Sequence, residues 1–177
     1  MPAGVASATV PSGFISFCMR FADQCATPTA NQNSVALSED NWLVLNDVNA
    51  QINASISPED DKDHYGRAEY WTIPADGRGD CEDYALAKRQ ALIKAGLPEL
   101  ALRMAVVLTS EGERHAVLTV TTDQGDYVLD NLTFEIRPWF KSGLTWIARQ
   151  DSTNPWNWVA LQPADPANQG ITAATIN

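Results

Sequence analysis

The sequence is short of positive charge, and this shortage excludes several classes of partner. Its 177 residues include 12 Lys and Arg against 22 Asp and Glu, which gives a net charge of −10 at pH 7. Nucleic acids and anionic membrane surfaces are bound through basic faces, so neither is an expected partner. Most of the acids are expected to form a solvated surface, although clustered carboxylates also suit a hard cation such as Ca²⁺.

Long apolar runs are also missing. No stretch approaches the roughly 20 residues that span a bilayer, and no basic segment followed by an apolar one marks a signal peptide at the start. The opening Met-Pro-Ala-Gly resembles the start of a trimmed chain, and on this interpretation we expect a signal peptide to have been removed. Because 45% of the residues are apolar and 19% charged, the composition indicates one globular domain. We expect an arm over 1–35, the domain over 36–165 and a tail over 166–177.

Cysteine is scarce, and the three present divide into a pair and a single residue. Cys18 and Cys25 lie seven positions apart in the expected arm. They can form a small disulfide loop in an oxidising compartment or remain two buried free thiols. Cys81 is then the single thiol, which is where a reactive one is sought. No Cys-x-x-Cys pair, His-rich zinc pattern or phosphate-binding glycine loop is present in the sequence.

Residues 37–56 have the pattern of an amphipathic helix. Ser38 is a suitable N-cap, and two acids follow it in the first turn, where the helix dipole favours them. Apolar residues then recur at spacings of three and four, at Trp42, Leu45, Val48 and Ile52. The following residues 57–79 contain prolines, glycines and a charged run, so a long loop of the kind that is often functional is expected there.

A second helix is expected over 81–95, followed by strands. Asp80 can cap its start, and Gly96 ends it. The basic residues of this helix lie toward its C-terminal half, where the dipole favours cations: Lys88, Arg89 and Lys94. Alternating apolar residues predict strands over 103–109, 115–121, 126–129, 144–149 and 158–161. Two helices followed by an antiparallel meander indicate an α+β fold.

Cys81 stands in the first turn of the second expected helix. Unpaired backbone N–H groups and the positive end of the dipole stabilise a thiolate there, and the same N–H groups can donate to an oxyanion. Asp80, Glu82 and Asp83 oppose this effect, because nearby carboxylates raise the pKa of a thiol. A bound divalent cation would neutralise them. A small buried residue without chemistry is the alternative role for Cys81.

His115 and Asp130 are expected to meet at one edge of the sheet. His115 begins one strand and Asp130 ends the next, and the turn at residues 123–125 joins the two as a hairpin. Antiparallel pairing around this turn brings the start of one strand beside the end of the other. The carboxylate would then orient the imidazole, as in a nucleophile–base–acid triad. The alternative interpretation of His115, taken by itself, is a half-exposed surface histidine. The alternative for Asp130 is an aspartate that caps the following turn. His64, in a charged loop, is expected at the surface.

Three blocks, in order, carry a resemblance to a known family. They are Gly79-Asp80-Cys81-Glu82-Asp83-Tyr84-Ala85, then Arg114-His115-Ala116-Val117-Leu118, then Gly125-Asp126-Tyr127-Val128-Leu129-Asp130-Asn131. Over about residues 12–160 the chain resembles the bacterial transglutaminase-like cysteine proteinases. The resemblance implies a papain-like and transglutaminase-like fold, with the nucleophile helix packed on an antiparallel sheet. It also implies that Cys81, His115 and Asp130 form the catalytic triad.

The resemblance further implies a setting for the enzyme. Members of the family are periplasmic, and one group clips large surface adhesins beside a pair of alanines and so regulates biofilms. That group binds Ca²⁺ near the nucleophile through side chains that match Asp80, Glu82 and Asp83. An inner-membrane receptor that responds to cyclic di-GMP sequesters the protease. Protein substrate, adhesin, receptor and calcium are therefore expectations for this chain.

Two other functions are compatible with the same residues. A transglutaminase or amidase would use the same triad and pass the acyl group to an amine instead of water. A calcium-dependent binding module without catalysis would need none of the three triad residues Cys81, His115 and Asp130. The leading expectation is a cysteine endopeptidase.

Overall fold

A computed structural model describes residues 1, 4, 6–29 and 32–161. The tail expected over 166–177 lies outside the described residues. The helices are α1 (Ser12–Arg20), α2 (Glu39–Ser55), α3 (Asp61–Tyr65) and α4 (Cys81–Lys94), with 3₁₀ turns at Ala22–Cys25, Glu99–Ala101 and Trp139–Lys141. The strands are β1 (Ala6–Ser7), β2 (Ser57–Pro58), β3 (Arg78–Gly79), β4 (Leu102–Leu108), β5 (Arg114–Thr122), β6 (Gly125–Leu129), β7 (Arg137–Pro138), β8 (Thr145–Gln150) and β9 (Trp158–Ala160).

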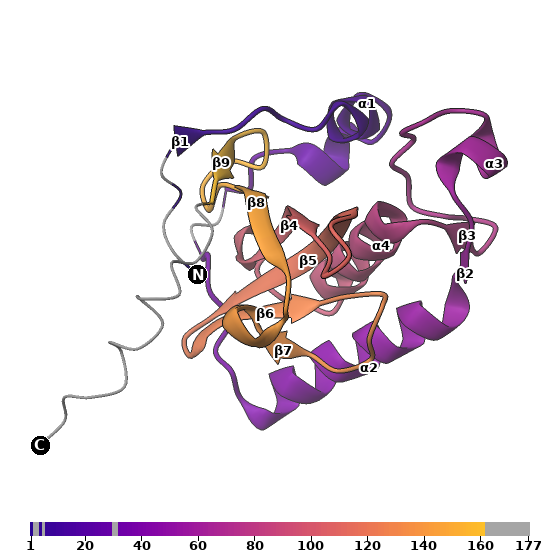
Figure 1. The fold of residues 1–177 in the computed structure, drawn as a ribbon. Coiled ribbons are helices and arrows are strands. Elements are labelled where there is room, and N and C mark those ends of the chain that lie inside the picture. The colour runs from indigo at the N-terminus through magenta and orange to yellow at the C-terminus, as the bar shows by residue number, and fades with distance from the viewer. Residues whose placement is uncertain (2–3, 5, 30–31, 162–177) are drawn as a thin grey trace, which may run out of the picture.

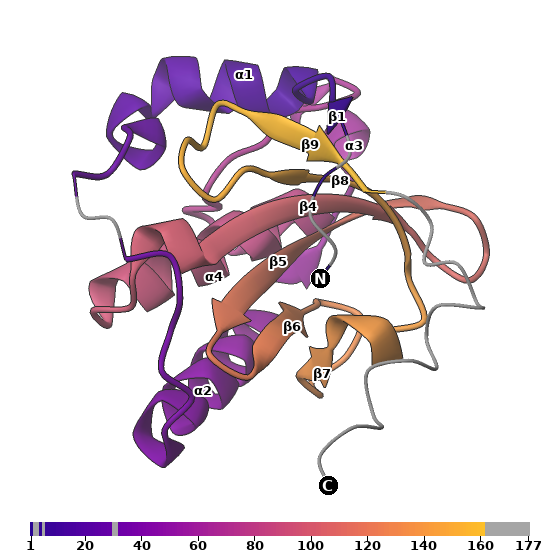
Figure 2. The ribbon, with the colours of Figure 1, turned by 90° about the vertical axis from the view of Figure 1, so that its left-hand side faces the viewer.

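Seven of the strands form one antiparallel sheet in the order β1-β9-β8-β4-β5-β6-β7. Figures 1 and 2 show α4 lying against the middle of this sheet and α2 running along its lower side. The two remaining strands, β2 and β3, pair in parallel just before α4. The α+β class with an antiparallel sheet, predicted from the sequence, is confirmed.

The β5–β6 hairpin is the part of the sheet that carries candidate site residues. Its register pairs Leu118 with Leu129 and Thr122 with Gly125. Gly125 has a φ of 113°, a conformation that favours glycine, and this makes the tight turn possible. All five strands predicted by alternation are present, with ends within one residue of the prediction.

The main core lies between the helices and one face of the sheet. Alternate residues of β4, including Met104 and Val106, meet Leu118 and Leu129 of the hairpin and Leu92 of α4. The opposite face carries a smaller apolar cluster that includes Val107 and Trp146. On that face Asp126 pairs with Arg103 at 3.5 Å and with Arg149 at 3.3 Å. The sheet is therefore covered on both faces.

The predicted first helix is confirmed as α2. Ser38 caps it, because its Oγ accepts a hydrogen bond from the backbone N–H of Asn41 at 3.2 Å. Leu45 is fully buried, whereas Trp42, Val48 and Ile52 are only partly buried. Asn49 is fully buried as well. The buried face of α2 is therefore more polar than its apolar spacing predicts.

The arm expected over 1–35 contains a helix, α1, that no sequence pattern predicted. Phe14 and Phe17 of α1 are buried in the main core, and the Phe14 ring meets Trp71 and Trp158 at centroid distances of 6.0 and 5.6 Å. Gly13 is required for this packing, because a Cβ there would lie 2.2 Å from the Trp71 ring. Packing of the aromatic face, rather than helix propensity, therefore stabilises α1.

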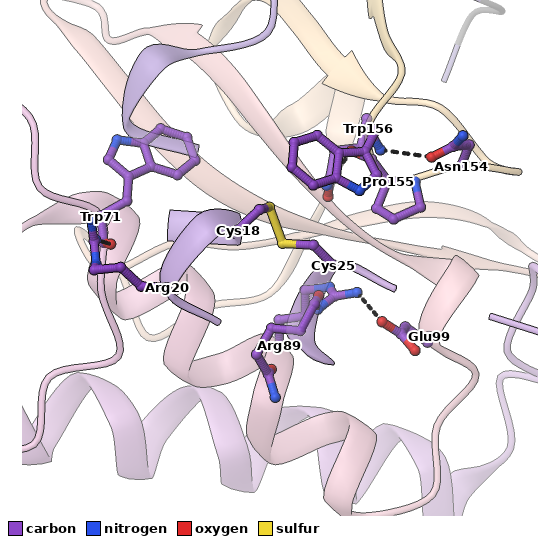
Figure 3. Close-up of a disulfide and its surroundings, with 11 residues drawn as sticks. Cys18, Arg20, Cys25, Trp71, Arg89, Glu99, Asn154, Pro155 and Trp156 are labelled. Carbon is purple, nitrogen blue, oxygen red and sulfur yellow. Dashed lines mark hydrogen bonds and ion pairs between the residues drawn. A yellow bond between two sulfur atoms is a disulfide. The ribbon is translucent and has the colours of Figure 1, made fainter. Parts of the chain in front are cut away.

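A disulfide joins Cys18 of α1 to Cys25, so of the two alternatives that the sequence left open the structure has the bonded pair. Figure 3 shows Arg89 reaching from α4 to the region below this bond. There its Nη1 donates to the Gln24 carbonyl at 3.0 Å and its Nη2 to Glu99 at 2.5 Å. The arm is thus tied to the helix that begins with Cys81.

The long segment between α2 and α4 is mostly loop, as expected, and is held down by short elements. It contains β2, α3 and β3, and its backbone bonds include Ser57 N–H to the Gly77 carbonyl at 2.8 Å. None of the helices among the described residues is both long and apolar enough to cross a bilayer.

Candidate active site

Cys81 is the first residue of α4, at the point where β3 runs into the helix. Asp80 is the N-cap by position, but its side chain makes no capping bond, which corrects the expected role. Its backbone carbonyl instead accepts the N–H groups of Asp83 and Tyr84 at 3.1 and 3.2 Å. Gly79 allows the close approach, since a Cβ there would lie 2.5 Å from Asp83 Oδ2.

His115 and Asp130 meet as the hairpin geometry predicts. His115 lies at the start of β5, Asp130 directly follows β6, and His115 Nε2 is 2.8 Å from Asp130 Oδ1. The same carboxylate oxygen accepts the backbone N–H of Leu132 at 3.0 Å. Both side chains are buried. With Nε2 facing the carboxylate, Nδ1 is the ring nitrogen left for another partner.

Helix α2 holds the loop that carries Asp130. Asn53 Nδ2 donates to the Asp130 carbonyl at 2.9 Å and to the Thr133 carbonyl at 3.1 Å, and Asn49 Nδ2 donates to the Phe134 carbonyl at 3.1 Å. These asparagines were not expected as site residues. The sequence signal for them is a pair of amides four positions apart on the inner face of an amphipathic helix.

The Cys81 thiol is in a resting arrangement. It donates to Glu82 Oε2 at 3.2 Å, and Sγ accepts the backbone N–H of Ala116 at 3.3 Å. Burial, and then the charge of Glu82, raise the pKa of the Cys81 thiol well above its usual value. The acids oppose a thiolate as the sequence predicted, but burial is the larger cause in this arrangement.

Cys81 lies where two surface hollows meet. One has a volume of about 580 Å³ and the other about 270 Å³. Both are lined by Glu69, Cys81, Glu82, Arg114 and His115. The larger continues over β2 and the loop after Asp130, and the smaller continues over the start of α1 and Trp71. We call the two together the groove; it passes across the thiol and extends beyond it on both sides.

Carboxylates gather beside Cys81 in two overlapping sets, of which Asp80 and Glu82 line the groove and Asp61 and Asp83 are buried next to them. The ligand atoms of Asp61, Asp80 and Asp83 lie within 4.8 Å of one another, and so do those of Asp80, Cys81 and Glu82. Of the three acids predicted to bind a metal, Asp80 and Asp83 therefore share a set with Asp61, and Glu82 lies in the other set. Asp61 was not predicted, because nothing in the sequence links a loop residue to a helix start so far along the chain.

The loop before α4 is fastened to these carboxylates. The backbone N–H of Tyr70 donates to Asp61 Oδ2, and that of Thr72 donates to Asp83 Oδ1 at 2.7 Å. Even so, burial, assisted by the neighbouring acids, raises the pKa of Asp83 to about 8 and that of Glu82 to about 9. Burial and the charge of Asp61 raise the pKa of Asp80 to about 6. The cluster is therefore short of positive charge.

Four other residues around the site have different surroundings. Two aromatic side chains near Cys81 could be considered as oxyanion donors, but the Tyr84 hydroxyl donates to the Ile56 carbonyl at 2.5 Å and Trp71 Nε1 to Glu69 at 2.9 Å, so neither is free for that role. His64, expected at the surface, is half-buried and bonds Asp76 at 2.9 Å. Lys88, expected to serve the helix dipole, is fully buried.

The fold and the site together define a transglutaminase-like protein, in which a cysteine at a helix start lies beside a histidine and an aspartate on an antiparallel sheet. The profile of the bacterial transglutaminase-like cysteine proteinases (BTLCP) matches residues 5–166. The chain belongs to this family.

Solved structures support the same fold. Calcium-bound LapG of Legionella pneumophila matches with a TM-score of 0.59 and 24% identity, covering 71% of this chain and 72% of that one. EGTA-treated LapG from the same organism matches with a TM-score of 0.58 and 24% identity, covering 73% and 74%. A comparison with curated proteins gives no match.

Proposed function

We propose that the protein is a cysteine endopeptidase that uses Cys81 as nucleophile, His115 as base and Asp130 as the orienting acid. The observation that carries the proposal is the groove, which is lined by the thiol and by His115 and continues from Cys81 over two different sets of residues, while Asp130 bonds His115 from behind. An extended polypeptide can lie along a groove of this kind. Membership of a cysteine proteinase family supports the same reaction class.

In the proposed reaction the Cys81 sulfur attacks the carbonyl carbon of a peptide bond. His115 takes the thiol proton at Nδ1 and gives it to the leaving amine, which breaks the C–N bond and leaves a thioester. Water, deprotonated by His115, then hydrolyses the thioester and restores the thiol. Asp130 holds the proton on Nε2 and stabilises the imidazolium. The backbone N–H of Cys81, at the helix start, is the oxyanion donor.

The acidic cluster beside the groove is proposed to bind Ca²⁺. One carboxylate oxygen each of Asp61, Asp80 and Asp83 is buried with no hydrogen-bond partner among the described residues. Hard oxygen donors in a set short of positive charge fit this ion. Asp61, Asp80 and Asp83 would hold it, with Glu82 beside them. The ion would supply the positive charge that stabilises these carboxylates in their ionised form.

The compartment and the partners are proposed on different grounds. A buried Cys18–Cys25 disulfide is typical of oxidising compartments and supports a periplasmic location. A large surface adhesin as substrate, a role in biofilms and an inner-membrane receptor responsive to cyclic di-GMP rest on the family resemblance and stay predictions.

Acyl transfer to an amine is the second candidate function, because the same triad serves it. Incubation of the protein with a library of unstructured peptides, Ca²⁺ and a labelled primary amine separates the two. New N-termini found by mass spectrometry, absent with Cys81→Ala, are the expected result. Label joined to glutamine side chains without cleavage would favour a transglutaminase. Neither product, with a thiol of ordinary reactivity, would favour the non-catalytic binding module.

A further inference from the structure

A buried lysine lies behind the candidate triad. Lys88 of α4 is 0% exposed, and its Nζ has no hydrogen-bond partner among the described residues. Burying an ammonium group without a partner costs several kcal/mol, and a methionine of similar length would avoid that cost. Retention of a lysine at such a position therefore requires a compensating role.

Lys88 lies on the same face of α4 as the candidate nucleophile Cys81. Cys81, Ala85, Lys88 and Leu92 recur at spacings of four, three and four, so they share one face of α4. Ala85 and Leu92 are buried in the core cluster with the inward residues of β5 and β6, Leu118 and Leu129. Lys88 thus points from the helix toward the strands that carry His115 and Asp130, two turns below Cys81.

Among the described residues, one charged group acts on Lys88. It is the carboxylate of Asp130, after β6, which is bonded to His115 of β5. From α2, the neutral asparagines 49 and 53 bond the backbone of the loop that carries Asp130. On α4 itself, Arg89 is engaged by Glu99.

We propose that Lys88 is a positioning residue of the candidate active site: its buried ammonium group keeps Asp130 ionised and thereby keeps His115 oriented for Cys81. The inference rests on the proposed function. Lys88 touches neither the thiol nor the groove, so it acts only through Asp130.

The titration of the two groups supports this role. Burial alone would raise the pKa of Asp130, but hydrogen bonds from His115 and Leu132, the charge of His115 and then the charge of Lys88 hold it below its usual value. Burial lowers the pKa of Lys88 to about 7, against the opposing charge of Asp130. Lys88 is therefore charged on the acidic side of neutrality, where Asp130 is closest to taking up a proton.

The test compares wild type with Lys88→Met, which removes the charge and keeps the length of the side chain. The rate of Cys81 alkylation by iodoacetamide is measured from pH 4.5 to 9 in calcium, together with kcat and KM on a cleaved peptide and the melting temperature. The matched control is Lys94→Met, on the last turn of the same helix, where the lysine is exposed and bonds only Gln90.

In Lys88→Met, the acidic limb of the profile of alkylation rate against pH should move up by roughly 0.5 to 1 pH unit. At a given pH on that limb, the alkylation rate should therefore be roughly 3- to 10-fold lower than in wild type. The rates should converge with wild type above about pH 8, where Lys88 has lost its charge. KM and the melting temperature should not fall, and Lys94→Met should behave as wild type. Lys88→Arg, which keeps the charge, should restore the acidic limb.

An unchanged acidic limb in Lys88→Met would overturn the inference. So would a rate lowered equally at every pH together with a lower melting temperature, since that pattern marks a purely structural residue. If Lys88→Met does not fold, Lys88→Gln is judged by the same criteria. Failure of the proposed function is distinguishable, because wild type itself would then lack both an activated thiol and cleavage.

Discussion

Asp130 has one role in the proposed mechanism, which is to orient His115, and this role can be tested apart from the fold. Asp130→Ala removes the carboxylate that faces His115 Nε2 and leaves the imidazole unoriented. Asparagine is unsuitable here, because it can orient the histidine itself in a Cys-His-Asn triad. We expect kcat to fall on the order of 10²-fold or more, with a smaller effect on the melting temperature, and steady-state kinetics on a cleaved peptide measure this. The control is Asp47→Ala on the exposed face of α2. Wild-type kcat in Asp130→Ala would exclude the orienting role.

Arg114 is expected to bind the substrate backbone. It is exposed, lines both halves of the groove and forms no ion pair with any described residue. Arg114→Ala should raise KM roughly tenfold, as expected for one lost hydrogen bond to a charged group, with a smaller change in kcat. Lys141→Ala, which lines neither hollow, is the control. A lower kcat at constant KM would assign Arg114 to the transition state instead.

At the residue scale, the sequence predicted contacts that depend on local geometry. The His115–Asp130 contact follows from one hairpin and its turn, so strand alternation was sufficient to place it. Asp61 joins Asp80 only because a long loop folds back on the start of α4. The burial of Lys88 likewise depends on how α4 packs, and a helical pattern alone does not reveal which of its faces are covered.

At the element scale, the junction between β3 and α4 couples the nucleophile to the acidic cluster. Gly79→Ala would place a Cβ 2.5 Å from Asp83 Oδ2, so this carboxylate must shift. We expect weaker calcium binding, measured by isothermal titration calorimetry, and a lower melting temperature. Ser57→Ala, on the exposed partner strand β2, is the control and should change neither. Equal calcium affinity in Gly79→Ala and wild type would show that Asp83 does not bind the ion.

The helices and strands that were predicted are those with a clear pattern in the local sequence. α4 and the central strands carry a clear period and clear ends, and they were predicted within one residue. Helix α1 was missed because Gly13 lowers helix propensity and the segment is short. Its stability comes from the contacts of Phe14 with Trp71 and Trp158, which belong to tertiary packing.

At the scale of the whole molecule, the buried acids predict how stability depends on pH. In the folded state the pKa of Asp80 is raised to about 6 and that of Asp83 to about 8, from 3.8 when unfolded. Between these values the folded state holds protons that the unfolded state has released, so the free energy of unfolding falls as pH rises. In EGTA the melting temperature should therefore fall from about pH 4 to pH 8.

Calcium should reverse much of this loss. An ion held by the ionised carboxylates binds the folded state and stabilises it more as pH rises. The gain in melting temperature on adding Ca²⁺ should thus be larger at pH 8 than at pH 5, whereas Mg²⁺ should give less because it dehydrates reluctantly. The measurement is a set of thermal melts at both pH values. A calcium effect that is independent of pH would contradict binding at these acids.

The central claim is that Cys81 is a nucleophile activated by His115, and the pH dependence of its alkylation tests this most directly. Iodoacetamide labelling of Cys81 is followed by mass spectrometry in wild type and His115→Ala, with calcium and then with EGTA. We predict fast labelling at or below neutral pH with calcium, slowed both by EGTA and by the substitution. Labelling that rises only near pH 8.5, the usual pKa of a free thiol, and that neither perturbation alters would contradict the claim.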